Sequence, residues 1–173
     1  VARQATEHCQ ARQPRPVLTE HVEDVWIEAD PERLAMIVEH VIRNAQDATP
    51  EAGSVTVEVG VEGGGAAGDP SDSSRLRVPT AVLAVTDTGA GMTAEFIDER
   101  LFKPFDTAKG SKGMGIGAYQ VREYVQSLGG RVEVRSEVGR GTRMVLRMPL
   151  ALPPASAASD PAPGQPAGAG VLS

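Results

Sequence analysis

Apolar residues recur at helical spacing in one stretch of the chain and alternate with polar residues in several others. Between Pro31 and Ala48 they follow positions i, i+3, i+4, i+7, i+8 and i+11, which predicts an amphipathic helix with a wide apolar stripe. Asp30 is suited to cap this helix, and Pro31 fits its first position. Two further helices are predicted, one over 93–101 and one over about 114–128 that ends at a pair of glycines.

Alternation predicts the strands. The clearest strand covers 54–61, where we expect every second residue to point inward: Val55, Val57, Val59 and Val61. Other strands are predicted at 17–21, 25–28 and 81–86, and the segments 131–136 and 142–149 are predicted to form a closing hairpin. Helices combined with a mixed, mostly antiparallel sheet indicate an α+β fold, a two-layer α/β sandwich with the helices on one face of the sheet.

Changes in composition suggest boundaries. Residues 151–173 are rich in Ala, Pro, Gly and Ser, which predicts a disordered tail. The glycine-rich segment 63–74 is predicted to be a flexible loop inserted between two strands. We expect a folded domain over 17–150, preceded by a linker over 1–16. The chain starts without Met or a signal peptide, so we expect it to be a fragment of a longer protein.

Charge and cysteine content exclude some functions. The chain has 17 basic and 23 acidic residues, for a net charge of −6, which argues against a general nucleic-acid binder. A single cysteine, Cys9, allows neither an internal disulfide nor a thiolate zinc cluster. No apolar run approaches the roughly 20 residues that a membrane span needs.

Four motifs carry the candidate chemistry. The first lies on the long predicted helix, where His40, Asn44 and Asp47 share one stripe at the edge of the apolar face. An amide oxygen in such a place suits a hard cation such as Mg²⁺. Taken alone, the stripe is more typical of the solvated flank of an amphipathic helix.

The second motif, from Asp87 to Met92, directly follows a predicted strand. Its carboxylate can accept a hydrogen bond from an exocyclic amine, and Gly89 and Gly91 allow a flat base to approach the backbone. Taken alone, this motif is an ordinary Asp-Gly turn.

The third and fourth motifs follow in order. Phe102 and Phe105 flank Lys-Pro and are suited to anchor a segment that carries Lys109 and Lys112, although a pinned loop with solvated lysines is the simpler alternative. The run Gly113-Met114-Gly115-Ile116-Gly117 then opens a helix. Its backbone amides are suited to bind phosphate, although it could also be a flexible hinge.

Together these motifs resemble the GHKL superfamily, and within it the catalytic ATP-binding (HATPase_c, Bergerat) domain of sensor histidine kinases. The resemblance covers about Val17 to Leu150. Asn44 matches the N box, the motif that begins at Asp87 matches the G1 box, Phe102 to Phe105 match the F box, and Gly113 to Gly117 match the G2 box.

The resemblance implies ATP and Mg²⁺ as cofactors. It implies that Asn44 ligates Mg²⁺, that Asp87 binds the adenine amine, and that Thr142 supports the base through water. The implied catalytic residues are His40, Asn44, Lys109 and Lys112, the two lysines lying on a lid over the γ-phosphate. The implied nucleotide-binding residues are Asn44, Asp47, Asp87, Gly89, Gly91, Met92, Phe105, Lys109, Gly113, Met114, Gly115, Ile116, Gly117 and Thr142.

Two positions separate this chain from parts of the superfamily. Gyrase-type ATPases carry a water-activating glutamate one turn before the metal-binding Asn, where this chain has His40. The neighbouring Glu39 points about 100° away around the helix. This favours phosphoryl transfer to a protein histidine over hydrolysis. Where many kinases carry a basic residue three positions after the Asn, this chain has Asp47, so Arg43, Lys109 or Lys112 would have to supply the cation beside the phosphates.

None of the three histidines fits a phosphoacceptor, because none lies on a suitable helix and precedes an acidic residue. The resemblance therefore implies a phosphoacceptor and dimerisation domain elsewhere in the same protein and a response regulator as partner, with no nucleic acid. It implies a monomeric fragment of a homodimeric kinase, on the cytoplasmic side of a membrane-anchored protein.

The amino-acid sequence of the F and G2 boxes also resembles that of the PrsK kinases, which are associated with exosortase (PEP-CTERM) sorting systems. Two other functions stay open from sequence: a GHKL serine kinase of the anti-sigma type, and a nucleotide sensor without transfer.

Overall fold

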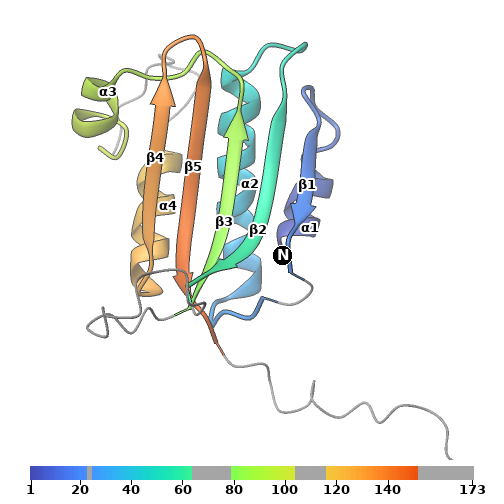
Figure 1. Cartoon of the computed structure of the whole chain (residues 1–173), viewed down its shortest axis with the longest axis vertical. Helices are drawn as coiled ribbons and strands as arrows, with labels where there is room; N and C mark the ends of the chain where they lie inside the picture. The colour runs from blue at the N-terminus through green and yellow to red at the C-terminus, as the bar shows by residue number, and fades with distance from the viewer. Residues whose placement is uncertain (23–24, 64–78, 104–115, 152–173) are drawn as a thin grey trace, which may run out of the picture.

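The chain folds into one mixed sheet with helices packed on one of its faces (Figure 1). The computed structural model describes residues 1–22, 25–63, 79–103 and 116–151. Its elements are α1 (Ala2–His8), β1 (Pro16–Glu20), α2 (Pro31–Ala48), β2 (Val55–Glu62), β3 (Thr80–Asp87), α3 (Ala94–Glu99), α4 (Ile116–Ser127), β4 (Arg131–Glu137) and β5 (Gly141–Pro149).

The strand order is β1-β2-β3-β5-β4, with β1 parallel to β2 and every other pair antiparallel. This sheet and its helical layer confirm the predicted α+β sandwich.

One predicted strand is wrong, because residues 25–28 form no strand. They run as a connection into α2, and the Trp26 carbonyl accepts a hydrogen bond from the Ala151 amide (2.8 Å). The predicted loop from residue 64 and the predicted tail from residue 152 lie outside the described residues.

Helix α2 has the predicted bounds. The Asp30 side chain accepts a hydrogen bond from the Arg33 amide (2.9 Å), which satisfies one of the free N–H groups of the first turn. Its apolar stripe faces the sheet, and its core members include Val38 and Ile42, both 0% exposed. On β2 the predicted inward alternation holds for Val55, Val57 and Val59 but fails at Val61, which is 38% exposed near the end of the strand.

Residues 1–16, expected to be a linker, contain a helix that the sequence patterns did not predict. Helix α1 packs against α2 and β1, and Ala5 and Cys9 (0% and 3% exposed) belong to the main core. No helix of the described part is long and apolar enough to cross a membrane.

A buried glutamine holds the connection between α1 and β1. The Gln46 side-chain amide, 2% exposed, lies within hydrogen-bond distance of three backbone carbonyls: Cys9 (3.1 Å), Arg12 (2.9 Å) and Pro14 (3.0 Å). Because a buried carbonyl without a donor is costly, this amide fastens the connection to α2.

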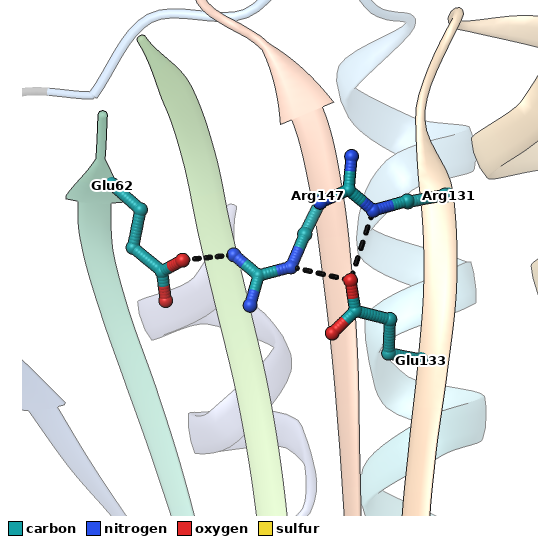
Figure 2. Close-up of polar contacts among 4 residues, drawn as sticks. All are labelled: Glu62, Arg131, Glu133 and Arg147. Atoms are coloured by element: carbon teal, nitrogen blue, oxygen red, sulfur yellow. Dashed lines mark hydrogen bonds and ion pairs between the residues drawn. The ribbon is translucent and has the colours of Figure 1, made fainter. Parts of the chain in front are cut away.

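The opposite face of the sheet is covered by ion pairs instead of helices. Figure 2 shows Arg147 of β5 between Glu62 of β2 and Glu133 of β4, with Arg131 of β4 contacting the same Glu133 carboxylate. Both Arg147 Nε and Arg131 Nε lie 2.9 Å from Glu133 Oε1. Hydrogen bonds from Arg131 and Arg147 lower the pKa of Glu133. The Arg147 side chain reaches across β3 to Glu62 on β2, and on this face Val82 and Ala84 of β3 and Val145 of β5 form a small buried cluster.

Replacing Gln46 tests how firmly α1 is attached. Gln46→Leu keeps the volume but removes the amide that lies within hydrogen-bond distance of the three carbonyls, so we expect it to lower the free energy of unfolding by about 2 to 4 kcal/mol in urea titrations. Gln126→Leu, at an exposed position of α4, is the matched control and should stay within about 0.5 kcal/mol of the wild type. Equal effects of the two substitutions would contradict the proposed attachment.

Candidate functional site

Asp87 is the last residue of β3 and lies in the interior, only 5% exposed. Its Oδ1 accepts a hydrogen bond from the Gly89 amide (2.8 Å), which folds the following turn back onto the carboxylate. Burial raises the pKa of Asp87, against the opposing effect of hydrogen bonds from the Gly89 and Thr142 backbones. A carboxyl group fixed at the end of a strand in this way can accept a hydrogen bond from a ligand amine.

The turn after Asp87 is pressed against the end of α2. The Ala90 amide donates to the Ala48 carbonyl (3.0 Å), and a side chain at Gly89 would place its Cβ 2.3 Å from that same carbonyl oxygen. Glycine is therefore required at position 89 by a close backbone approach. This contact brings the end of β3 to the C-terminal end of the helix that carries Asn44.

The same turn contacts the loop between β4 and β5. Gly91 has φ +65° and lies against the Glu137 carbonyl, and the Gly139 amide donates to the Ala90 carbonyl (2.8 Å). Gly141 has φ +111°, and a Cβ there would lie 2.0 Å from the Asp87 carbonyl oxygen. All these loops meet at the upper end of the sheet in Figure 1, beside the end of α2.

Ser136 links these loops and was missed in the sequence analysis. Its hydroxyl accepts a hydrogen bond from the Met92 amide (2.8 Å), donates to the Gly141 carbonyl (2.9 Å) and pairs with the Thr142 hydroxyl (2.9 Å). Ser136 and Thr142 are directly opposite in the β4–β5 register. The sequence offered one signal for Ser136: it is a hydroxyl residue on the predicted hairpin, opposite Thr142. Thr142 is thereby placed next to Asp87, its partner in the β3–β5 register.

Asn44 and His40 face the beginning of α4. An ideal Cβ at Gly117 would lie 3.4 Å from Asn44 Nδ2 and 4.0 Å from His40 Nδ1. The structure therefore brings the predicted N box to the end of the predicted G2 box, and the absence of a side chain at Gly117 leaves space between them. Asn44 is exposed and His40 half-buried, so both side chains can be reached by a ligand.

Glu39 and Asp47 both contact the N-terminal segment, and of the two only Glu39 points well away from the stripe of His40 and Asn44. Glu39 bonds to His8 Nδ1 (2.7 Å) and to the Arg43 guanidinium (2.9 Å). Asp47 forms an ion pair with Arg12. Glu39 is thus held away from the side that Asn44 and Gly117 share, as the helical geometry predicted.

The base of the F box is attached to α4. The Arg122 guanidinium stacks over the Phe102 ring, 4.7 Å from its centre, and its Nη2 lies 3.4 Å from the Phe102 carbonyl. Several predicted site residues lie outside the described residues: Phe105, Lys109, Lys112, Gly113, Met114 and Gly115. Ile116 is the first residue of α4.

A cavity in the described part lies at the opposite end of the sheet, around Leu128 and Met148. None of the predicted nucleotide-binding residues lines it. The candidate site is therefore the surface between α2, the start of α4 and the turn after β3.

Comparison with known proteins agrees with this arrangement. Residues 29–152 match the family model described as histidine kinase-, DNA gyrase B- and HSP90-like ATPase. The chain is 32% identical over 145 residues to the histidine protein kinase DivJ of Caulobacter vibrioides, covering 81% of this chain and 21% of DivJ. It is 30% identical over 124 residues to the sensor histidine kinase ZraS of Escherichia coli, covering 72% of this chain and 23% of ZraS.

Solved structures show the same fold. The mycobacterial sensor histidine kinase MprB aligns with a TM-score of 0.67 at 21% identity, over 86% of this chain and 91% of that structure. Full-length ShkA in complex with AMPPNP aligns with a TM-score of 0.69 at 26% identity, over 89% of this chain and 30% of ShkA.

The chain belongs to the histidine kinase-, DNA gyrase B- and HSP90-like ATPase family. Within that family it is the catalytic ATP-binding domain of a sensor histidine kinase, as predicted from its boxes. It spans only 21% of DivJ and 23% of ZraS.

The β4–β5 loop offers a matched pair of glycines to test the close packing around Asp87. Gly141→Ala should lower the free energy of unfolding by about 3 kcal/mol or more, because its Cβ would clash with the Asp87 backbone in a conformation that only glycine favours. Gly139→Ala, with φ +79° and nothing within 4 Å of its Cβ, should cost only about 1 kcal/mol. Similar losses at both positions in urea unfolding would contradict the tight contact.

Asp87→Asn should stabilise the nucleotide-free domain at neutral pH. Because the pKa of Asp87 is raised, the folded protein holds the proton more tightly than the unfolded chain does. The contribution of Asp87 to stability is therefore complete below the ordinary aspartate pKa of about 3.9 and is lost as the pH rises through the raised value. Asparagine avoids that loss.

Urea unfolding of wild type and Asp87→Asn as a function of pH measures this effect. The difference in unfolding free energy should be largest near neutral pH and should disappear in acid, where both side chains are uncharged. A variant that is less stable than wild type at neutral pH would contradict the assignment.

Proposed function

We propose that this domain binds Mg-ATP between α2, the start of α4 and the turn after β3, and transfers the γ-phosphoryl group to a histidine on a separate dimerisation domain. A response regulator would then receive the phosphoryl group. The observation that carries the proposal is the convergence of Asn44 with Gly117 on one side of α2, at the end where Asp87 meets the same helix.

The spacing along α2 supports the proposal of one nucleotide that contacts both groups. Ala48, which contacts the turn after Asp87, is four residues beyond Asn44, about 6 Å along the helix axis. Asp87 would then accept a hydrogen bond from the adenine amine, with Thr142 beside it. Asn44 would face the phosphates, and the amides at the start of α4 would lie near them.

The donor set on α2 fits a hard cation. Asn44 offers an amide oxygen at an exposed position, a ligand type that Mg²⁺ accepts together with water and phosphate oxygens. When bound, Mg²⁺ would neutralise charge that develops on the transferred group. The role of the protein is mainly to position the groups, because phosphoryl transfer needs alignment and charge neutralisation more than covalent chemistry.

The position of Glu39 favours transfer over hydrolysis. A base that activates water must reach the γ-phosphate, but Glu39 is engaged with His8 and Arg43 on the opposite flank. His40 occupies the position that faces Gly117. We therefore propose that water at the γ-phosphate is poorly activated.

The decisive experiment mixes the domain with radiolabelled ATP and a separately produced dimerisation and acceptor domain. We expect acid-labile, base-stable phosphate on the acceptor. Asn44→Ala should reduce the transfer at least about 100-fold, because the Mg²⁺ ligand is lost, whereas Gln126→Ala at the far end of α4 should leave it unchanged.

Three other outcomes would each contradict the proposal. Acid-stable phosphate would indicate a serine kinase. Binding of ATP without any transfer would indicate a nucleotide sensor. Rapid ATP hydrolysis by the isolated domain, abolished by His40→Ala, would indicate a water-activating ATPase.

Two finer expectations also remain proposals. The domain would lie on the cytoplasmic side of a membrane-anchored, homodimeric kinase, and the resemblance of its F and G2 boxes to PrsK kinases would place it in a protein-sorting system.

A further inference from the structure

We propose that Ser136 is a positioning residue for base selectivity, because it makes the Thr142 hydroxyl a hydrogen-bond acceptor beside Asp87. The Thr142 and Asp87 side chains would then both accept hydrogen bonds and favour a base with an exocyclic amine over one with a carbonyl oxygen. This inference deepens the proposed function and rests on it, because it assumes that the base of the nucleotide lies beside these two residues.

Three polar side chains form a row across three strands, at the end of the sheet where α2 also ends (Figure 1). Asp87 of β3 is the register partner of Thr142 of β5, and Thr142 is the partner of Ser136 of β4. The residues two positions away on each strand belong to the main core or pack against it: Val85, Met144 and Val134. Because side chains two positions apart point to the same face of a sheet, the row lies on the face that carries α2 and α4.

The hydrogen bonds of Ser136 decide which hydroxyl donates. A serine hydroxyl has one proton and can accept two hydrogen bonds. The Gly141 carbonyl can only accept, so it takes the Ser136 proton at 2.9 Å. The Met92 amide can only donate, so it fills one acceptor position of Ser136 at 2.8 Å. In the remaining contact, at 2.9 Å, Ser136 therefore accepts the proton of Thr142.

The half-buried Thr142 hydroxyl is thereby left with acceptor positions for a ligand, because its single proton is directed to Ser136. The neighbouring Asp87 carboxylate, when ionised, also only accepts. An amine placed against these two groups can donate to both. A carbonyl oxygen in the same place would face two acceptors and lose its hydrogen-bond partner.

A purely structural role of Ser136 makes a different prediction. Through Gly141 and Met92, Ser136 also joins the start of β5 to the turn after β3. Loosening that connection would change the binding of all purine nucleotides alike. The direction of the Thr142 hydroxyl, by contrast, changes the ratio between an amino-purine and an oxo-purine, since selectivity is a difference of affinities.

Calorimetric titrations with Mg-ATP and Mg-ITP test the inference, because ITP carries a carbonyl oxygen in place of the exocyclic amine. A pH of about 8 keeps Asp87 ionised although burial raises its pKa. In Ser136→Ala the Thr142 proton can turn toward the base, so the ratio of the ITP to the ATP dissociation constant should fall about fivefold. Ser136→Thr keeps a hydroxyl and should retain the wild-type ratio.

The effect should depend on Thr142. Thr142→Val removes the hydroxyl and should weaken ATP more than ITP, because an acceptor is lost and not a donor; this variant tests the inference even if Ser136→Ala does not fold. In the Thr142→Val background, Ser136→Ala should no longer change the ratio. Ser127→Ala is the matched control: it removes a hydroxyl that donates to the Tyr124 carbonyl (2.7 Å) near the far end of α4, and should leave both affinities unchanged.

The outcomes are distinct. The inference is wrong if Mg-ATP binds wild type but the ratio in Ser136→Ala stays within twofold of it, or if Thr142→Val weakens ITP as much as ATP. A change of ratio that persists in the Thr142→Val background would also overturn it, because Ser136 would then act through the loops alone. If wild type binds neither nucleotide, the proposed function fails instead.

Discussion

The candidate site depends on one close backbone contact, between the turn after β3 and the C-terminal end of α2. The Ala90 amide donates to the Ala48 carbonyl. The backbones are so close that position 89 has no room for a side chain, and glycine occupies it. The last carbonyls of a helix have no partner within the helix, so a neighbouring loop can satisfy one of them. Through this bond the buried carboxylate of Asp87 is held at a fixed distance from the helix that carries Asn44.

Helix α2 serves both the core and the site because its faces differ. Its apolar stripe packs on the sheet, with Val38 and Ile42 fully buried. One polar flank faces α4 and carries His40 and Asn44, and the other contacts the N-terminal segment through Glu39 and Gln46. A helix anchored along its whole length offers a rigid support, which a site for phosphoryl transfer needs because alignment is its main contribution.

Charge is arranged differently on the two faces of the sheet. On the face away from α2 and α4, Arg143 and Arg147 of β5 reach across β3 to Glu58 and Glu62 of β2, and Arg147 also pairs with Glu133 of the adjacent β4, as Figure 2 shows for Arg147. These pairs neutralise one another and cover Val82, Ala84 and Val145. At the nucleotide end, by contrast, Asp87 is a buried carboxyl group, and its burial raises its pKa. A buried group of this kind is unfavourable for the empty protein and available to a ligand.

The sequence by itself determined the helix that begins at Pro31, most of the strands and the order of the four boxes. These follow from local chemistry: apolar spacing, a capping Asp30, and glycines at turns. Tertiary structure alone decided that α1 belongs to the core, that Ser136 of β4 joins the start of β5 to the turn after β3, and that Arg12 pairs with Asp47. Each of these depends on residues distant in the chain, such as Arg12 and Asp47. No periodicity encodes such contacts, because they arise only when separate elements pack against one another.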